Sequence, residues 1–362
     1  MIRKKKHQLA NPFVTSGHIE IGGPFVGRRD NLQHLIHNMI ADQPTSINVI
    51  GNKNLGKSCL LYRFSKTWKN WIDEQKHSQY VVIYLSFGNE RGTRENRFYQ
   101  YIAEELAAQV DNNSELYQAM HIKQWNREKF NQALKRWKAL KVLPVLCLDD
   151  FELLVKHRKT FDDDFYNNMR YLMGNHYLML IVASRKQIKV YKKEYKLASS
   201  FFNDVHNLPL KDLNKEEVKE LLATKDSMGE FALSVPEQRL ARDWGKSHPR
   251  LLQLAGYCLF YARQSTQGVD WAKKEFNEQA QNVPRLADKW VEWLVQKAQA
   301  LPKIGNFLGQ LIRFIGNALT HIGAIFLLIV FIFALIGFVS WDSLKEMLPS
   351  FPAEITEWLN KK

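Results

Sequence analysis

The sequence predicts an α/β fold in which a parallel β-sheet lies between two layers of helices and is followed by a helical lid. Three observations lead to this fold: strand-like runs that are apolar almost throughout, helical patterns between those runs, and helical patterns alone after Leu213. Strands that are buried on both faces are typical of parallel sheets. The 362 residues also exceed what one core usually holds, since single cores stop growing at about 250–300 residues.

The predicted core alternates strands and helices. Apolar residues recur at helical spacing from Leu32 to Ile40, before the first strand, and a second helical pattern covers 99–110, after the second strand. A polar insertion with Asn112 and Asn113 comes next. The predicted strands are 46–50, 80–86, 143–148 and 177–183. Ligands of such sheets bind at the carboxyl ends of the strands, so the residues that follow each strand are the candidates for function.

The first strand leads directly into a predicted phosphate-binding loop. Residues 51–58 fit the pattern G-x-x-x-x-G-K-[ST], and the residues that follow read as the expected helix. Glycines allow successive backbone N–H groups to face a polyphosphate, the Lys57 charge reaches the β- and γ-phosphates, and the Ser58 hydroxyl ligates Mg²⁺. The expected ligands are therefore a nucleotide and Mg²⁺. The residues expected to bind the nucleotide here are Gly51, Asn54, Gly56, Lys57, Ser58 and Cys59.

Acidic residues at the end of the third strand complete the predicted hydrolytic chemistry. Hydrolysis requires a carboxylate that positions Mg²⁺ and a group that orients the attacking water. Asp149 is expected to hold Mg²⁺ through water, and Asp150 to act as the base, with Glu152 as its substitute. An acidic turn at the strand end is the alternative interpretation. Together these motifs predict a P-loop NTPase with a three-layer αβα parallel sheet.

Composition limits the classes of partner and compartment. Lys and Arg number 51 against 37 Asp and Glu, and the net charge of +14 favours an anionic partner such as nucleotide, nucleic acid or an acidic lipid surface. The three cysteines show neither pairing nor metal-ligand spacing, which indicates a reducing compartment. The basic segment 1–23 has no apolar stretch of the kind found in secretory signals, so we expect a solvated tail.

The sequence predicts one transmembrane helix near the C-terminus, at 322–341. Residues 322–339 contain no charged side chain and would span about 27 Å as a helix, close to the thickness of the hydrocarbon core. A buried core helix is the alternative, although an apolar surface on every face suits a bilayer better. Nucleotide is abundant in the cytoplasm, so the ATPase part is expected there, with 342–362 on the far side. Lys297, Lys303 and Arg313 before the span agree with this orientation.

An amphipathic helix is predicted ahead of the span, at 304–319. Its apolar stripe suits a helix that lies in the headgroup plane of the membrane. The second interpretation depends on Gly305 and Gly309, whose G-x-x-x-G spacing could pack helices of several subunits around a shared aqueous path. A homo-oligomer is expected under either interpretation, because the leading hypothesis couples nucleotide state to oligomerisation.

Several short motifs resemble those of the STAND and archaeal-type branch of the AAA+-like P-loop ATPases. They are Phe25-Val26-Gly27-Arg28-Arg29-Asp30, the acidic pair, Ala183-Ser184-Arg185, Leu208-Pro209-Leu210 and Ser247-His248-Pro249-Arg250-Leu251-Leu252. The resemblance covers about 24–281. It implies that Gly27 and Arg28 border the adenine, that Arg185 senses the γ-phosphate and that Pro249 packs on the nucleotide. By the same likeness Arg170 could act on the nucleotide of a neighbouring subunit, with a plain surface arginine as the alternative.

The sequence also departs from that family. Asp149-Asp150 stands where Asp-Glu is common, which favours slow, switch-like hydrolysis, and neither a repeat sensor nor a winged helix follows residue 281. The predicted parts are a basic tail (1–23), a P-loop ATPase core (24–212), a helical lid (213–283), a linker with the amphipathic helix (284–321), a transmembrane helix (322–341) and a short C-terminal tail (342–362).

The leading hypothesis is a membrane-anchored ATPase switch that couples nucleotide state to oligomerisation or signalling, including defence. Its signal would arrive through the lid, the far-side tail or an unidentified sensor or partner protein. The alternative is a membrane-tethered, ATP-dependent nucleic-acid-binding scaffold that uses the lysines of 186–196. The third hypothesis is a subunit that binds nucleotide but does not hydrolyse it.

Overall fold

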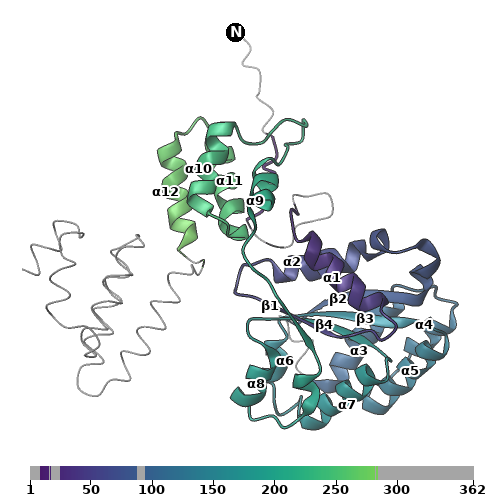
Figure 1. The fold of residues 1–362 in the computed structure, drawn as a ribbon. Helices are drawn as coiled ribbons and strands as arrows, with labels where there is room; N and C mark the ends of the chain where they lie inside the picture. Colours follow the sequence, from purple (N-terminus) through teal and green to yellow (C-terminus); the bar gives the residue numbers. More distant parts are fainter. Residues whose placement is uncertain (1–8, 16, 18–24, 88–93, 282, 284–362) are drawn as a thin grey trace, which may run out of the picture. The chain divides into compact units, whose positions relative to one another are not determined.

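A computed structural model describes residues 9–15, 17, 25–87, 94–281 and 283. Within these residues the chain forms a parallel sheet of five strands in the order β2-β3-β4-β1-β5 (Figure 1). The strands are β1 (Ile47–Ile50), β2 (Tyr80–Ser86), β3 (Leu143–Asp149), β4 (Met179–Ser184) and β5 (His206–Pro209). The predicted parallel sheet is confirmed, with β4 shifted slightly toward the C-terminus.

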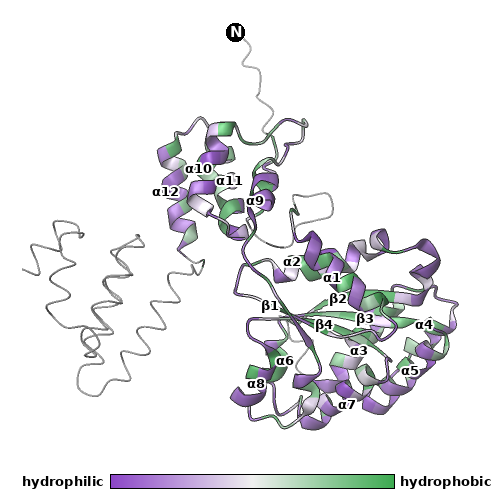
Figure 2. Cartoon of the chain, viewed as in Figure 1, coloured by the Kyte–Doolittle hydropathy of each residue, from purple (hydrophilic) through white to green (hydrophobic). Residues whose placement is uncertain are grey.

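Alternate residues of each strand pack into two separate apolar layers, as the strands of a doubly covered sheet must. On β3, Val145 and Cys147 pack with α1 (Arg29–Ile40) and α2 (Lys57–Thr67). Leu146 and Leu148 pack into the opposite layer, which is built by α3 (Glu95–Ala107), α5 (Arg127–Ala139) and α7 (Asp163–Gly174). Figure 2 shows the apolar strands between helices whose outer faces are polar. The three-layer αβα arrangement is therefore confirmed.

Two parts of the core have a structure that the sequence pattern did not predict. The insertion after α3 contains α4 (Glu115–Met120) and α5, and α5 buries Phe130, Leu134 and Trp137 completely. The edge strand β5 pairs with β1 and ends in Pro209. An edge strand tolerates proline because one side of its backbone has no ladder partner. Short helical segments complete the core: η1 (Trp68–Trp71), η2 (Glu74–Gln79), α6 (Glu152–Lys156), α8 (Ile188–Glu194) and η4 (Ser200–Asn203).

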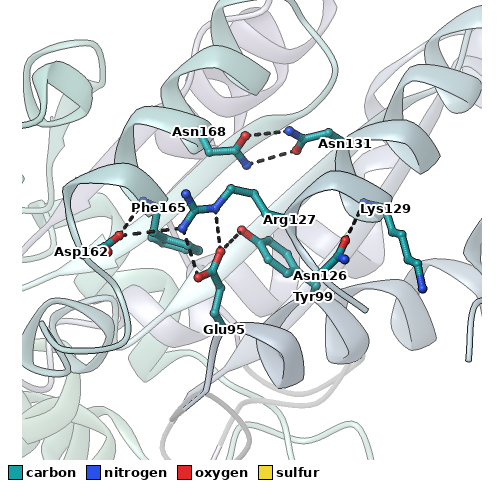
Figure 3. A network of polar contacts seen from close by, with 9 residues as sticks. All are labelled: Glu95, Tyr99, Asn126, Arg127, Lys129, Asn131, Asp162, Phe165 and Asn168. Atoms are coloured by element: carbon teal, nitrogen blue, oxygen red, sulfur yellow. Dashed lines mark hydrogen bonds and ion pairs between the residues drawn. The ribbon is translucent and has the colours of Figure 1, made fainter. Parts of the chain in front are cut away.

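A polar network joins the first turns of α3, α5 and α7 (Figure 3). Arg127 of α5 donates from Nε to Oε1 of Glu95 at 2.8 Å, and its Nη2 lies 3.8 Å from Oδ1 of Asp162, the N-cap of α7. The Tyr99 hydroxyl donates to the same Glu95 oxygen at 2.7 Å. Burial, followed by the hydrogen bond to Glu95, raises the pKa of Tyr99. Three helices that are separate in sequence are thus fixed together at the carboxyl edge of the sheet.

The lid consists of helices α9 (Lys215–Leu222), α10 (Val235–Gly245), α11 (Pro249–Gln264) and α12 (Val269–Ala280) within the described residues. Capping boxes begin α9, with Asn214 and Glu217, and α10, with Ser234 and Glu237. Such boxes satisfy the first backbone N–H groups of a helix. α11 is the central helix, because its residues Leu252, Ala255 and Cys258 are fully buried in the lid core.

The segment 9–15 packs against α11, although the sequence predicted a tail over 1–23. Phe13 is 3% exposed, and its ring lies so close to Gly256 that an added Cβ there would come within 2.6 Å of it. Val14 N donates to Oε1 of Gln253 at 3.0 Å, and Asn11 Nδ2 donates to the carbonyl of Tyr257 at 3.0 Å. This segment is therefore part of the lid core.

No helix in the part of the chain that the structure describes is long and apolar enough to cross a membrane. The predicted linker with its amphipathic helix (284–321), transmembrane helix (322–341) and C-terminal tail (342–362) lie outside the described residues.

Candidate active site

A cavity of about 390 Å³ lies at the carboxyl ends of the strands, where the phosphate-binding loop meets the lid. Its volume lies within the usual range of ligand pockets, about 300–1,000 Å³. The loop and the helix after it contribute the residues of 53–59, and the acidic turn contributes Asp150 and Glu152. Arg185, Pro249 and Arg250 also line it. The structure thus gathers most of the predicted site residues around one cavity.

The phosphate-binding loop is closed by backbone conformations that suit its glycines. Gly51 N donates to the carbonyl of Ser184 at 3.2 Å, which anchors the start of the loop to β4. Asn54 and Gly56 have φ values of 68° and 87°, in the left-handed region, and α2 begins directly afterwards at Lys57. Backbone N–H groups at the start of a helix form an anion site, because they lack partners within the helix.

The side chain of Lys57 lies over its own loop. Its Nζ donates to the carbonyl of Asn52 at 3.0 Å. Burial lowers the pKa of Lys57, while nearby carboxylates, with Glu152 first and Asp149 second, act in the opposite direction. A polyphosphate would therefore meet a lysine that already lies among the acids of the site.

Asp149 accepts a hydrogen bond from a tyrosine that was not among the residues predicted from the sequence. The Tyr84 hydroxyl donates to Oδ2 of Asp149 at 2.8 Å, and Asp149 is only 4% exposed. Burial first, and then Asp149, raises the pKa of Tyr84, so its hydroxyl keeps its proton. The contact depends on the register that sets Tyr84 of β2 beside Cys147 of β3. The sequence alone does not reveal that register.

The residues predicted to hold Mg²⁺ fit such an ion in chemistry. Mg²⁺ prefers a few hard oxygen ligands and keeps several waters and phosphate oxygens in its shell. Ser58 offers a hydroxyl at the start of α2, and Asp149 a carboxylate that is oriented by Tyr84. No cluster of three or more His, Cys, Asp or Glu side chains suited to a metal occurs among the described residues. The set therefore fits an ion that is held mainly by the nucleotide.

Both candidate bases lie in the cavity, in different surroundings. Asp150 has a left-handed backbone, with φ 52°, and burial together with Asp149 raises its pKa. Glu152 begins α6, is 8% exposed, and its Oε1 lies 3.2 Å from Nε of Arg185. The Oε2 atom of Glu152 is buried and accepts no hydrogen bond from the described residues. The two acids thus differ in burial and in partner.

Arg170 lies at the other edge of the sheet. It pairs with Asp204 and lines a separate cavity together with Ser46 and His176, which precede β1 and β4. Within one protomer the structure does not bring Arg170 to the phosphate-binding loop. Its action on the nucleotide of a neighbouring subunit stays a prediction.

Gly27 and Arg28 connect the phosphate-binding loop to the lid. Arg28 is buried, and its Nη2 donates to the carbonyl of Leu55 in the loop at 3.1 Å. Its backbone N donates to Oε1 of Glu217, in the first turn of α9, at 2.7 Å. Gly27 has φ 72°, and a Cβ there would approach that same carboxylate oxygen to 2.4 Å. Arg28 lines the cavity, and the contact of this pair with adenine stays a prediction.

The lid contributes the start of α11. Pro249 is its first residue, a position that proline favours because its missing N–H would lack a helical partner there. His248 is the N-cap, and its Nδ1 accepts from Leu251 N at 3.4 Å. Arg250 lines the cavity, and burial lowers its pKa. Arg250 was not among the predicted site residues, although its place beside Pro249 was a signal for it.

Comparison with known proteins gives the same fold. Residues 28–207 match the family model of the bacterial TniB protein. No curated protein matches the sequence. The Walker-type ATPase paby2304 of Pyrococcus abyssi is similar at 16% identity, with 80% of this chain and 84% of that chain covered and a TM-score of 0.53.

The Aeropyrum pernix ORC2 protein in its ADPNP–ADP complexes is similar at 13% identity, with 79% of this chain and 78% of that chain covered and a TM-score of 0.53. Its ADP form gives 10% identity, coverage of 79% and 75%, and a TM-score of 0.51. The chain has the fold of an AAA+-like P-loop ATPase.

Proposed function

We propose that this protein is a membrane-anchored ATPase of STAND or AAA+ type that works as a switch. In this proposal ATP binding and hydrolysis are coupled to oligomerisation or signalling at the membrane, with defence among its roles. The observation that carries the proposal is the single cavity in which the phosphate-binding loop, the acidic turn, Arg185 and the start of α11 meet. ORC2 of Aeropyrum pernix was solved with ADPNP and ADP, which supports an adenine nucleotide here.

The predicted site residues have the following roles in this proposal. Lys57 and the N–H groups of the loop bind the β- and γ-phosphates, while Ser58 and Asp149 hold Mg²⁺. Mg²⁺, when bound, neutralises charge that develops on the phosphates. A carboxylate of the acidic turn accepts a proton from the attacking water. Arg185, which is 61% exposed at the cavity, can reach a γ-phosphate.

Lid contacts supply the difference between nucleotide states that a switch requires. The γ-phosphate is present only with ATP, and both Arg185 of the core and Arg250 of the lid line the cavity that would hold it. The Glu217 carboxylate links α9 to Arg28, which in turn binds the phosphate-binding loop. A change at the loop would therefore reach the lid through direct hydrogen bonds.

Membrane anchoring is supported by the uncharged run 322–339. We expect the full-length protein to remain in the membrane pellet after an alkaline carbonate wash. Substitution of Ile329→Arg together with Ile332→Arg should release it, because an arginine at the centre of a span costs about 2.5–3.5 kcal/mol. Release of the wild-type protein by the same wash would contradict the anchor.

A second candidate function is ATP-dependent binding of nucleic acid. The observation in its favour is the group of lysines on and beside α8, where Lys189, Lys192, Lys193 and Lys196 surround a surface cavity of about 530 Å³. Such residues bind phosphates with a strong dependence on salt. A DNA mobility shift with the detergent-solubilised full-length protein separates the two functions, since the switch predicts no shift at physiological salt.

A further inference from the structure

The pair formed by Glu152 and Arg185 joins one element that follows β3 to another that follows β4. Glu152 is the first residue of α6, and Arg185 comes directly after the last residue of β4. Their side chains differ strongly in exposure, at 10% for Glu152 and 61% for Arg185. A buried carboxylate is thus held by an arginine that is accessible from the cavity.

Only one oxygen of Glu152 takes part in this pair. Oε1 lies 3.2 Å from Nε of Arg185, whereas Oε2 is buried and accepts nothing from the described residues. A buried carboxylate oxygen without a donor is unfavourable, the more so because it is charged. Because Oε2 is buried, a water in the cavity would meet Glu152 at Oε1, the oxygen that Arg185 holds.

Glu152 also lies close to Lys57 of the phosphate-binding loop. Glu152 is the carboxylate with the largest effect on the pKa of Lys57, ahead of Asp149 and Asp150. Asp150, by contrast, donates its backbone N–H to Oδ1 of Asp149 at 3.0 Å, and no ion pair with an arginine involves its side chain among the described residues. Of the two acids, Glu152 is thus the one that an arginine of the cavity holds in place.

We propose that Glu152 is the catalytic base, and that Arg185 is a latch which holds Glu152 until the γ-phosphate draws the guanidinium away. The inference rests on the proposed ATPase function and specifies its base and its regulation. A γ-phosphate competes well for Arg185, because it offers more negative charge than one carboxylate and accepts two parallel hydrogen bonds. ADP lacks this group and leaves the pair closed.

Hydrolysis is a displacement at the γ-phosphorus. The oxygen of water forms a bond to the γ-phosphorus while the bond to the bridging oxygen of ADP breaks, and that oxygen keeps the electron pair. The proton of the water passes to the Glu152 carboxylate, and the products are ADP and inorganic phosphate. Glu152 then releases this proton to solvent, and once phosphate leaves, Arg185 pairs again with the Glu152 carboxylate. The γ-phosphate is therefore both the group that is hydrolysed and the group that draws Arg185 away from Glu152.

The test measures binding of ATPγS and ADP, with Mg²⁺, to the full-length protein in detergent. In Glu152→Gln the ion pair is lost, so we expect ATPγS to bind about fivefold more tightly, the effect of removing a partly exposed pair. ADP affinity should stay within about twofold, which also shows that the variant is folded. Hydrolysis should fall about 100-fold or more, as for loss of a general base.

Arg185→Ala should weaken ATPγS toward the affinity of ADP. In the double variant the gain from Glu152→Gln should vanish, since the latch acts only through Arg185. The matched control is Glu194→Gln, which removes an exposed acid that pairs with Lys186 outside the cavity and should change neither affinity nor hydrolysis.

Failure of the proposed ATPase function and failure of the Glu152–Arg185 latch give different results. A wild-type protein that binds neither nucleotide would overturn the proposed function. Two results would overturn the latch alone, provided that the wild-type protein binds and hydrolyses ATP. In the first, Glu152→Gln binds ATPγS no more tightly than wild type does. In the second, Glu152→Gln tightens ATPγS binding by the same factor in the Arg185→Ala background. Loss of hydrolysis in Asp150→Asn with normal hydrolysis in Glu152→Gln would likewise assign the base to Asp150.

Discussion

Tyr84 shows how one hydroxyl can fix the orientation of Asp149, the carboxylate that we propose as the Mg²⁺ partner. It donates to Oδ2 of Asp149 from the neighbouring strand, and burial around it keeps the proton on the oxygen. A carboxylate held in this way presents its remaining lone pairs in a fixed direction. Groups that orient metal ligands commonly affect metal affinity as much as activity.

Replacing Tyr84 by phenylalanine should therefore weaken ATP binding in the presence of Mg²⁺ by about tenfold, the lower end for loss of such a partner. Binding measured with EDTA should not change, because the hydroxyl acts on the nucleotide only through the ion. Tyr80→Phe is the matched control, since it removes a hydroxyl elsewhere on β2. Equal binding by Tyr84→Phe and wild type with Mg²⁺ would contradict a role of Asp149 as metal partner.

At the scale of elements, α11 connects the cavity to the lid core. Its first residues, Pro249 and Arg250, line the cavity, and its middle is buried among the other lid helices. The helix depends on His248 as its N-cap, and an N-cap contributes about 0.5–2 kcal/mol. The imidazole must be neutral to accept the hydrogen bond from Leu251 N.

This cap makes lid stability depend on pH. Burial, assisted by Arg28 and opposed by Asp212, lowers the pKa of His248 in the folded state. The unfolded chain, with an ordinary histidine pKa of about 6.5, takes up the proton first as pH falls, so stability is complete above that value and is lost below it. We expect the melting temperature to fall between pH 7 and 5.5.

Asparagine at position 248 keeps an acceptor for the cap and does not titrate. His248→Asn should therefore reduce the fall in melting temperature over that interval, whereas His34→Asn, at an exposed position on α1, should leave it as in wild type. An identical pH profile for His248→Asn and wild type would rule out this histidine as the source.

At the scale of the whole described chain, the cavity joins parts that are far apart in sequence. The sequence predicts the phosphate-binding loop, the acidic turn and the central strands because each depends on a local pattern. The packing of Phe13 against Gly256 and the contact of Tyr84 with Asp149 depend on residues that meet only after folding. The strand β5 was missed because its residues are mostly exposed and carry no apolar run.

The contrast between local patterns and contacts formed on folding also applies to the choice of base in the acidic turn. The sequence places Asp150 and Glu152 two residues apart and ranks them by their distance from the strand end, with Asp150 first. The structure adds the arginine that comes from another strand, the buried oxygen and the left-handed backbone of Asp150, all of which depend on the packing of β4 beside β3.

The central claim, that the cavity binds ATP, is tested most directly by equilibrium binding of ATP with Mg²⁺ to the full-length protein and to Lys57→Ala. The wild type should bind, and Lys57→Ala should bind about 100-fold more weakly or not at all, since it loses charged hydrogen bonds to the phosphates. Lys66→Ala, which removes an exposed lysine of the same helix, is the control and should bind as wild type does. Normal ATP binding by Lys57→Ala would contradict the assignment.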